Sequence, residues 1–264
     1  MDLQLKNKKA FVSGSTSGIG YGVAKWLLSE GASVVINGRK QYSITTAIES
    51  LRHDYPEAKV SGLQADFEKV DHIDRLISEL GDIDILINNV GIYASQSFYD
   101  MSDEEWLRHF QVNVMSGVRL SRKLLPKMIQ KNWGRIIFIS SECASIVPTD
   151  MIAYSMTKTA MHTVSRGLAQ LAKGTGVTVN TVMPGSTMTE GAITFLEGVA
   201  SQENKTKEEV ADEFFTNVRT SSLLQRFATV DEIASTICYL VSPLAAATNG
   251  SSIKIDGGST GGIM

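Results

Sequence analysis

The sequence predicts an α/β protein with a doubly wound, parallel seven-stranded sheet and helices on both faces. Two observations predict this fold class. Short β-branched runs alternate with longer segments of helical periodicity along the chain, and strands joined through helices pair in parallel. No linker rich in proline or glycine interrupts the alternation, so we expect residues 1–264 to form one domain.

The predicted strands are short apolar runs that are bounded by turn or helix signals. In chain order they are Ala10–Val12, Ser33–Ile36, Val60–Leu63, Ile83–Ile87, Arg135–Ile139, Val177–Val182 and Ile253–Ile255. The predicted helices between them repeat apolar residues every three or four positions. They are Gly18–Glu30, Ser43–Arg52, Val70–Leu80, Ser102–Gln130, Ala153–Lys173 and Val230–Val241.

The segment from Ser186 to Leu224 departs from this alternation. It carries the polar stretch SQENKTKEE and only a weak helical pattern, around Glu208–Phe215. Long connections inside a compact domain are usually functional or mobile. We therefore expect residues 186–224 to form a substrate lid within the domain.

Composition and charge exclude several classes of function. The 25 basic and 28 acidic residues are spread without a strongly basic block, so nucleic acid is not expected as a partner. The chain lacks an apolar run of about eighteen residues, and its N-terminus lacks the regions of a signal peptide. We therefore expect no membrane association and a cytoplasmic location.

The residues that commonly bind metals do not cluster in the sequence. Cys143 and Cys238 are far apart and show no C-x-x-C spacing. The histidines lack the spacing of a metal-ligand set: His53, His72, His109 and His162. We therefore expect no metal cofactor, two reduced thiols and histidines that are ordinary helix residues.

The stretch FVSGSTSGIG predicts a phosphate-binding loop of the Rossmann type. A predicted strand runs into Gly14, and Gly18 and Gly20 open the next helix. Gly14 permits a tight turn, Gly18 lets backbone N–H groups approach a pyrophosphate, and Gly20 lets the helix pack closely on the sheet. The spacing G-x-x-x-G-x-G differs from G-x-G-x-x-G, so the prediction also depends on the strand, loop and helix context.

The end of the second strand indicates which dinucleotide is bound. An acidic residue about twenty positions after the glycine loop would hold the ribose 2′-OH of NAD. Here the sequence reads Asn37, Gly38, Arg39 and Lys40. The Arg39 guanidinium suits a 2′-phosphate, with Lys40 adding a second positive charge, so NADP(H) is favoured over NAD(H).

A tyrosine and a lysine at helical spacing form the candidate catalytic pair. Tyr154 and Lys158 are four residues apart and share one helix face. A neighbouring ammonium favours the phenolate and lowers the pKa of a tyrosine toward the working range. Ser141 follows an apolar strand thirteen positions before the tyrosine. Ligands in parallel sheets lie at this carboxyl edge, where a serine hydroxyl can hold the substrate oxygen.

Taken in order, these motifs resemble the short-chain dehydrogenase/reductase family over essentially the whole chain. The family's T-G-x-x-x-G-x-G is matched by Ser13, Gly14, Gly18, Ile19 and Gly20, and its N-N-A-G by Asn88, Asn89, Val90 and Gly91. Its P-G-x-x-x-T is matched by Pro184, Gly185 and Thr189, with Thr187 between them, and the C-terminal IDGG fits its last strand and turn. Serine for threonine and valine for alanine are the departures.

The resemblance also implies the roles of individual residues. It implies a tetrad of Asn113, Ser141, Tyr154 and Lys158, in which Tyr154 transfers a proton to or from the substrate oxygen. Lys158 would bind the nicotinamide ribose and stabilise the phenolate, Asn113 would hold a water beside Lys158, and Ser141 would orient the substrate. The remaining cofactor contacts are expected at Ser15, Ser17, Asp66 and Phe67.

The expected function is an NADP(H)-dependent oxidoreductase that moves a hydride between nicotinamide and a small carbonyl compound or alcohol. Two alternatives stay open: a 3-oxoacyl-thioester (acyl-carrier-protein) reductase, which RFATVDEIAS at Arg226–Ser235 also resembles, and a non-catalytic dinucleotide-binding regulatory protein. The resemblance implies a homotetramer, with a homodimer as the alternative, built through Ser102–Gln130 and Ala153–Lys173. The substrate depends on the lid and on side chains such as Glu142, Val147, Met151 and Met188, so the sequence does not identify it.

Overall fold

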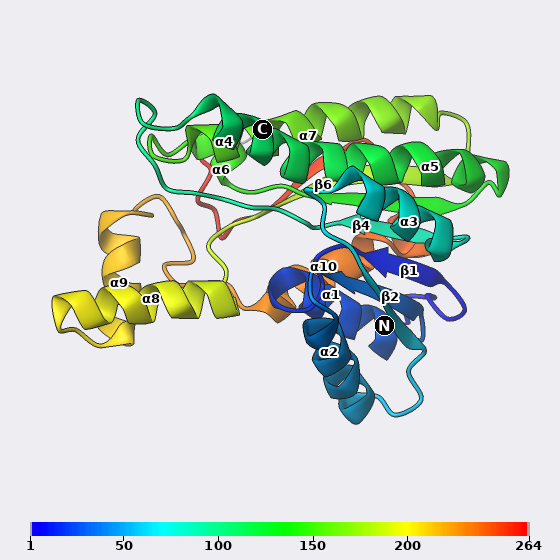
Figure 1. Cartoon of the computed structure of the whole chain (residues 1–264), viewed down its shortest axis with the longest axis horizontal. Coiled ribbons are helices and arrows are strands. Elements are labelled where there is room, and N and C mark those ends of the chain that lie inside the picture. The colour runs from blue at the N-terminus through cyan, green and yellow to red at the C-terminus, as the bar shows by residue number, and fades with distance from the viewer. Residues whose placement is uncertain (1, 263–264) are drawn as a thin grey trace.

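The computed structural model describes residues 2–262 and confirms the predicted fold class (Figure 1). Seven parallel strands form one sheet in the order β3-β2-β1-β4-β5-β6-β7. The strands are β1 (Lys9–Val12), β2 (Ser33–Gly38), β3 (Val60–Gln64), β4 (Ile85–Asn88), β5 (Gly134–Ile139), β6 (Val177–Pro184) and β7 (Ser252–Ile255). The chain reverses its direction across the sheet between β1 and β4, and parallel sheets bind ligands at such a switch point.

Helices cover both faces of the sheet, as predicted (Figure 1). On one face are α1 (Gly18–Ser29), α2 (Gln41–Asp54) and α10 (Val230–Leu240), and on the other are α3 (Val70–Leu80), α5 (Ser116–Gln130) and α7 (Ile152–Leu171). Leu27, Ile44 and Ile237 are buried on the first face, and Leu76 and Leu120 on the second. Among the helices described, none is long and apolar enough to span a bilayer.

The predicted helix at Ser102–Gln130 is interrupted in the structure. It consists of α4 (Asp103–His109), a π-helical turn at Phe110–Met115, and then α5. Ser102 caps the first helix by accepting a hydrogen bond from the Glu105 N–H. The apolar periodicity continues through the turn, so the π-helical turn cannot be recognised in the sequence pattern. A π-helical turn adds a residue to the helix and is frequent at functional sites, and this one carries Asn113.

The segment 186–224 is more helical than predicted. It contains α8 (Glu190–Glu203) and α9 (Lys207–Asn217), which project from the end of the sheet (Figure 1). The polar run that suggested a loop includes a helix end, with Asn204 in the left-handed conformation, and a new start at Thr206. Thr206 and Glu209 form a reciprocal capping box, a signal that the sequence carried.

Helices α8 and α9 have a small apolar cluster of their own. Leu196, Ala200 and Val210 pack together, and Phe227 joins them from the segment that follows. Because so small a cluster needs few apolar residues, the helical pattern in this part of the sequence is weak. The end of the segment 186–224 is held by the C-terminal segment, because the backbone N–H groups of Leu223 and Leu224 both donate to the Gly257 carbonyl, at 2.8 and 2.9 Å.

The short helix α6 (Cys143–Ile146) was also not predicted, and Glu142 is the one residue between it and Ser141. Both cysteines are buried and free, as expected. Burial raises the pKa of the Cys238 thiol to about 12, which keeps it protonated at neutral pH.

Candidate active site

The glycine loop connects β1 to α1 at the carboxyl edge of the sheet. Gly14 and Gly18 have φ angles of 60° and 59°, in the left-handed region that favours glycine. A Cβ placed on Gly20 would lie 2.5 Å from Asn89 Nδ2 and 2.6 Å from the Gly14 carbonyl oxygen. Because neither contact leaves room for a side chain, the close packing that was expected of Gly20 is present.

Ser13 and Asn89 fasten this loop to the end of β4. The Ser13 hydroxyl donates to the Ile87 carbonyl at 3.2 Å and accepts from the Asn89 N–H at 2.9 Å. The Asn89 side-chain amide donates to the carbonyl oxygens of Ser13 at 3.0 Å and Gly14 at 2.8 Å. The hydroxyl that serine shares with the family's threonine is therefore used in building the loop.

Ser15 is placed differently from the other predicted cofactor residues. Its side chain is fully buried, and its hydroxyl donates to the Val12 carbonyl at 2.6 Å. Its backbone N–H donates to the Asn37 carbonyl at 2.9 Å. Both hydrogen-bond donors of Ser15 are thus used inside the protein. Ser15 therefore stabilises the glycine loop by binding it to the backbone of Val12 and Asn37.

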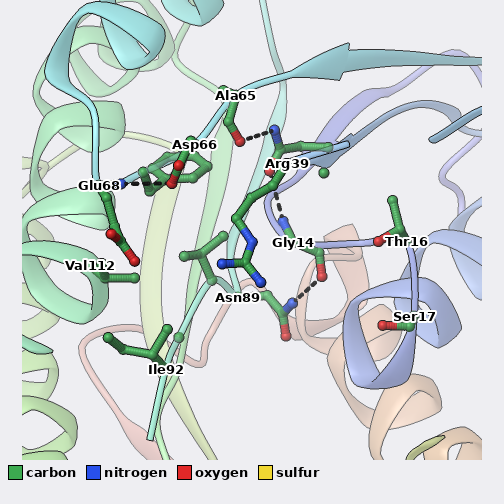
Figure 2. A pocket seen from close by; sticks show the side chains of 15 residues that line it. Gly14, Thr16, Ser17, Arg39, Ala65, Asp66, Glu68, Asn89, Ile92 and Val112 are labelled. Atoms are coloured by element: carbon green, nitrogen blue, oxygen red, sulfur yellow. Dashed lines mark hydrogen bonds between the residues drawn. The ribbon is translucent and has the colours of Figure 1, made fainter. Parts of the chain in front are cut away.

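A cavity of about 260 Å³ lies beside the glycine loop, between the ends of β1, β2 and β4 (Figure 2). Eight of the predicted cofactor residues line it: Gly14, Ser17, Arg39, Asp66, Phe67, Asn89, Val90 and Gly91. The Arg39 side chain extends into the middle of this cavity (Figure 2). The structure therefore brings together predicted residues from four separate stretches of the sequence.

The end of β2 has no room for an acidic side chain at residue 38. A Cβ on Gly38 would lie 2.7 Å from Thr16 Cγ2 and 3.2 Å from Ile44 Cγ1. The carboxamide of Asn37 is hydrogen-bonded within the protein, because it accepts from the Gly14 N–H at 3.1 Å and donates to the Leu63 carbonyl at 3.0 Å. Arg39 is the charged residue of this strand end that lines the cavity.

Tyr154, Ser141 and Lys158 converge at the carboxyl end of β5. The Tyr154 phenol lies close enough to the Ser141 side chain for that serine to lower the pKa of the tyrosine in part. The Lys158 Nζ lies 5.4 Å from the centre of the Tyr154 ring and donates to the Ile139 carbonyl at 2.8 Å. Helix α7 carries the tyrosine and the lysine on one face, as their spacing predicted, and β5 ends beside them.

The charges at this cluster differ from the sequence-based expectation. The pKa of Tyr154 is raised above its ordinary value by desolvation, and the hydrogen bond with Ser141 opposes the rise in part. We expected the ammonium of Lys158 to lower this pKa, but burial has the larger effect. Burial also lowers the pKa of Lys158 to about 8. In the protein alone, the phenol therefore keeps its proton and can act as an acid.

Asn113 and Gly91 lie next to the lysine. Both sides of the Asn113 carboxamide bind Ile92, whose N–H donates to Oδ1 at 2.8 Å and whose carbonyl accepts from Nδ2 at 2.9 Å. The same Nδ2 donates to Thr157 Oγ1 at 2.9 Å. A Cβ on Gly91 would lie 3.2 Å from Lys158 Nζ and 3.6 Å from Asn113 Oδ1. Glycine at 91 therefore leaves space between these two polar groups.

The predicted residues after β6 face the glycine loop from the opposite side. A Cβ on Gly185 would lie 2.7 Å from the Asp256 Cα, so the chain after β6 passes close to that after β7. Thr187 is buried, and Thr189 caps α8. The next residue, Glu190, accepts a hydrogen bond from the Gly18 N–H at 2.8 Å, which places a carboxylate at the N-terminus of α1.

Two residues near the cluster, Tyr93 and Arg219, had no role in the sequence-based prediction. The ring of Tyr93 contacts the Tyr154 ring edge-on, with 6.1 Å between centroids. Glu142, which the sequence analysis named only among side chains on which the substrate depends, forms an ion pair of 2.7 Å with Arg219. Tyr93 follows the N-N-A-G match closely enough to have been found, but a pair of residues 77 positions apart leaves no signal in a single sequence.

One of the histidines, His162, occupies a structural position. His162 lies between two strand ends, with Nε2 2.8 Å from Ser140 Oγ and Nδ1 2.7 Å from Ser252 Oγ. Burial and the nearby Lys158 lower its pKa. Within residues 2–262, His, Cys, Asp and Glu side chains form no group of three that could hold a metal ion.

Comparisons with known proteins agree with this fold. The model of the short chain dehydrogenase family matches residues 8–199. The uncharacterized oxidoreductase YvrD of Bacillus subtilis (strain 168) is 47% identical over 261 residues, which are 98% of each chain. The 3-oxoacyl-[acyl-carrier-protein] reductase FabG of Aquifex aeolicus (strain VF5) is 30% identical over 98% of this chain and 99% of its own. The crystal structure of L-sorbose reductase from Gluconobacter frateurii, complexed with NADPH and L-sorbose, matches with a TM-score of 0.93 at 28% identity and covers 100% of both chains.

The fold and these relatives together define an α/β oxidoreductase with a Rossmann-type sheet. Within that class, the chain belongs to the short-chain dehydrogenase family. The resemblance on which the sequence analysis depended is therefore confirmed at the level of the family.

Proposed function

We propose that the protein is an NADP(H)-dependent oxidoreductase that interconverts a small carbonyl compound and the corresponding alcohol, with Tyr154 as the general acid and base. One observation carries the proposal. Gly91 lines the cavity beside the glycine loop and also faces the Lys158 ammonium, so the cavity and the Tyr154 cluster adjoin. A dinucleotide that lies along this edge of the sheet can therefore extend from Arg39 to Tyr154.

The residues present fit the cofactor. The Gly18 N–H donates to the Glu190 carboxylate, which supports the proposal that the start of α1 binds an anion such as the pyrophosphate. Arg39 extends into the cavity, and the crowded position 38 excludes the carboxylate that an NAD-specific site would place there. The L-sorbose reductase structure is complexed with NADPH, which supports the same cofactor here.

In this scheme the bound nicotinamide supplies or accepts the hydride, and the protein moves the proton. The phenol of Tyr154, whose pKa is raised by desolvation, retains its proton and donates it to the carbonyl oxygen as that oxygen becomes negative. The Ser141 hydroxyl holds the same oxygen and stabilises the developing charge. In alcohol oxidation the proton moves back, and the nearby ammonium of Lys158 favours the transient phenolate.

The proposal can be tested with a panel of aldehydes, ketones and secondary alcohols. Each compound is assayed with NADPH, NADP, NADH and NAD, and the nicotinamide absorbance is followed. We expect turnover of at least one panel member and a preference for the phosphorylated cofactor. Binding of NADPH without turnover of any compound would favour the regulatory alternative. A FabG protein is among the relatives, so the panel includes a 3-oxoacyl thioester to test the acyl-reductase alternative.

The Arg39→Ser variant tests the cofactor assignment. Loss of a charge-assisted contact worth roughly 1.5–3 kcal/mol should raise the Kd for NADPH about 10- to 150-fold and leave that for NADH nearly unchanged. Fluorescence titration of both cofactors measures the two constants. Arg75→Ser, which removes a 61% exposed arginine from α3, is the matched control and should change neither. Equal losses for both cofactors in Arg39→Ser would contradict a role at the 2′-phosphate.

We further propose that the protein is a single-domain, cytoplasmic enzyme in which residues 186–224 act as the substrate lid. We also propose that it assembles as a homotetramer. Large apolar side chains exposed near the predicted contact helices support an assembly, among them Leu107, Phe110 and Met156. Sedimentation equilibrium distinguishes a tetramer from a dimer or a monomer.

A further inference from the structure

Glu142 lies between the catalytic cluster and the lid. It directly follows Ser141, and its side chain is only 4% exposed. Its backbone N–H donates to the Pro184 carbonyl at 2.9 Å, which extends the pairing of β5 and β6 beyond the strand ends. The backbone that carries Ser141 is therefore fixed on both sides, by β5 before it and by Glu142 after it.

One oxygen of the Glu142 carboxylate contacts both ends of the lid. Oε1 accepts from Ser186 Oγ at 3.2 Å, just before α8, and from Arg219 Nε at 2.7 Å, just after α9. The Arg219 side chain is 13% exposed, so solvent screens this pair little. Arg219 also lies over the Phe214 ring at 5.6 Å, which connects the ion pair to the aromatic residues of α9.

The second carboxylate oxygen makes this arrangement unusual. Glu142 Oε2 is buried and has no hydrogen-bond partner among the residues described. Burying a charged oxygen without a partner is unfavourable, and a well-packed apolar pair is often at least as stable as a buried ion pair. Stability alone therefore does not account for a glutamate here, whereas a requirement for fixed geometry does.

We propose that Glu142 is a positioning residue for the reaction, and that its carboxylate holds both ends of the lid against the strand that carries Ser141. This inference rests on the proposed function. Ser141 and the lid bound the substrate from two sides, so one carboxylate sets the distance between them. Glu142, Ser186 and Arg219 do not line the cavity of Figure 2, so cofactor binding should be largely independent of them.

The variants Glu142→Gln and Arg219→Met, alone and combined, test this assignment. Misplacement of the substrate by about 1 Å costs roughly 10²-fold in rate, so each single variant should lose on the order of 10²-fold in kcat/KM. The NADPH Kd, measured by fluorescence, should stay within about threefold of wild type. Because both variants break the same contact, the double variant should lose no more than the worse single variant.

Hydrogen exchange provides a readout that does not depend on turnover. In both single variants the amides of α8 and α9 should exchange faster than in wild type, while those of the central strands should not. Asp82→Asn, which removes an exposed carboxylate that pairs with Lys127 and Lys131, is the control and should change neither exchange nor kcat/KM. Arg219→Lys retains the charge and should recover part of the activity that Arg219→Met loses.

The outcomes separate the two proposals. If wild type turns over no carbonyl compound, the proposed function fails, and the exchange of α8 and α9 still decides whether Glu142 holds the lid. If wild type is active, then wild-type kcat/KM in Glu142→Gln, or losses that add in the double variant, would overturn the positioning role. If Glu142→Gln does not fold, Arg219→Met and Arg219→Lys carry the same comparison from the other partner.

Discussion

The Tyr154→Phe variant is expected to lose roughly 10²- to 10⁴-fold in kcat, the range of rate that a general acid contributes. The ring remains, so the edge-on contact with Tyr93 should persist, and NADPH should bind as in wild type. The loss follows from the proposed mechanism, in which the phenol keeps its proton because desolvation raises its pKa, and then donates that proton to the substrate oxygen. Steady-state kinetics on the best substrate of the panel measure the effect.

The matched control for this variant is Tyr99→Phe, which removes the hydroxyl of a tyrosine that is 93% exposed. Its kcat should equal that of wild type. A Tyr154→Phe enzyme that retains more than about a tenth of the wild-type kcat would show that another group supplies the proton, and the assignment of the general acid would then be wrong.

The Lys158→Met variant should lose activity and also change how stability depends on pH. Burial lowers the pKa of Lys158 from 10.5 to about 8, so between these values the unfolded chain binds more protons than the folded one. The contribution of Lys158 to the free energy of unfolding therefore rises as the pH increases from about 8 to 10.5. Below pH 8 the free-energy cost of burying the ammonium is fully present. That cost is on the order of 3 kcal/mol, from 1.36 kcal/mol for each pKa unit.

Urea unfolding at pH 7 and at pH 10 measures this dependence. Between the two pH values wild type should gain stability relative to Lys158→Met, while activity of the variant should be low at both. Lys173→Met, at an exposed lysine just after α7, should follow wild type in activity and in pH dependence. Parallel stability curves for wild type and Lys158→Met would show that the lysine is not desolvated in solution.

Much of this fold could be predicted because its signals are local. The seven strands are short apolar runs, and each ends at a turn or at the start of a helix. After β1, for example, Ser17 and Gly18 mark the start of α1. The core residues of the helices repeat at three and four positions, which places Leu27 and Leu76 against the sheet. Such patterns survive in one sequence because packing on a sheet requires them at every helix.

The parts that could not be predicted depend on contacts between distant residues or on small changes in helix geometry. The π-helical turn at Asn113 shifts the helix by one residue without altering its composition. The ion pair of Glu142 and Arg219 joins residues that are far apart in the chain. The helices of the lid could have been found in part, because Thr206 and Glu209 had the spacing of a capping box.

The position of Tyr154 and Lys158 was predicted correctly from spacing, but their pKa values were not. Spacing says that two side chains share a helix face, whereas a pKa depends on how much solvent the folded protein excludes. Desolvation raises the pKa of Tyr154 and lowers that of Lys158, and its extent can be judged only from the packed structure.

The anchoring of Leu223 and Leu224 to Gly257 has a consequence for biosynthesis. Both residues donate to a carbonyl that lies beyond β7, the last strand of the sheet to be translated. While the ribosome still holds residues 252–257, strands β1 to β6 can already form, but the segment after α9 lacks its partner. We therefore expect the proposed activity to appear only at the end of synthesis, and a chain that is cut before Gly257 to lose activity although Gly257 lies far from Tyr154 in the sequence.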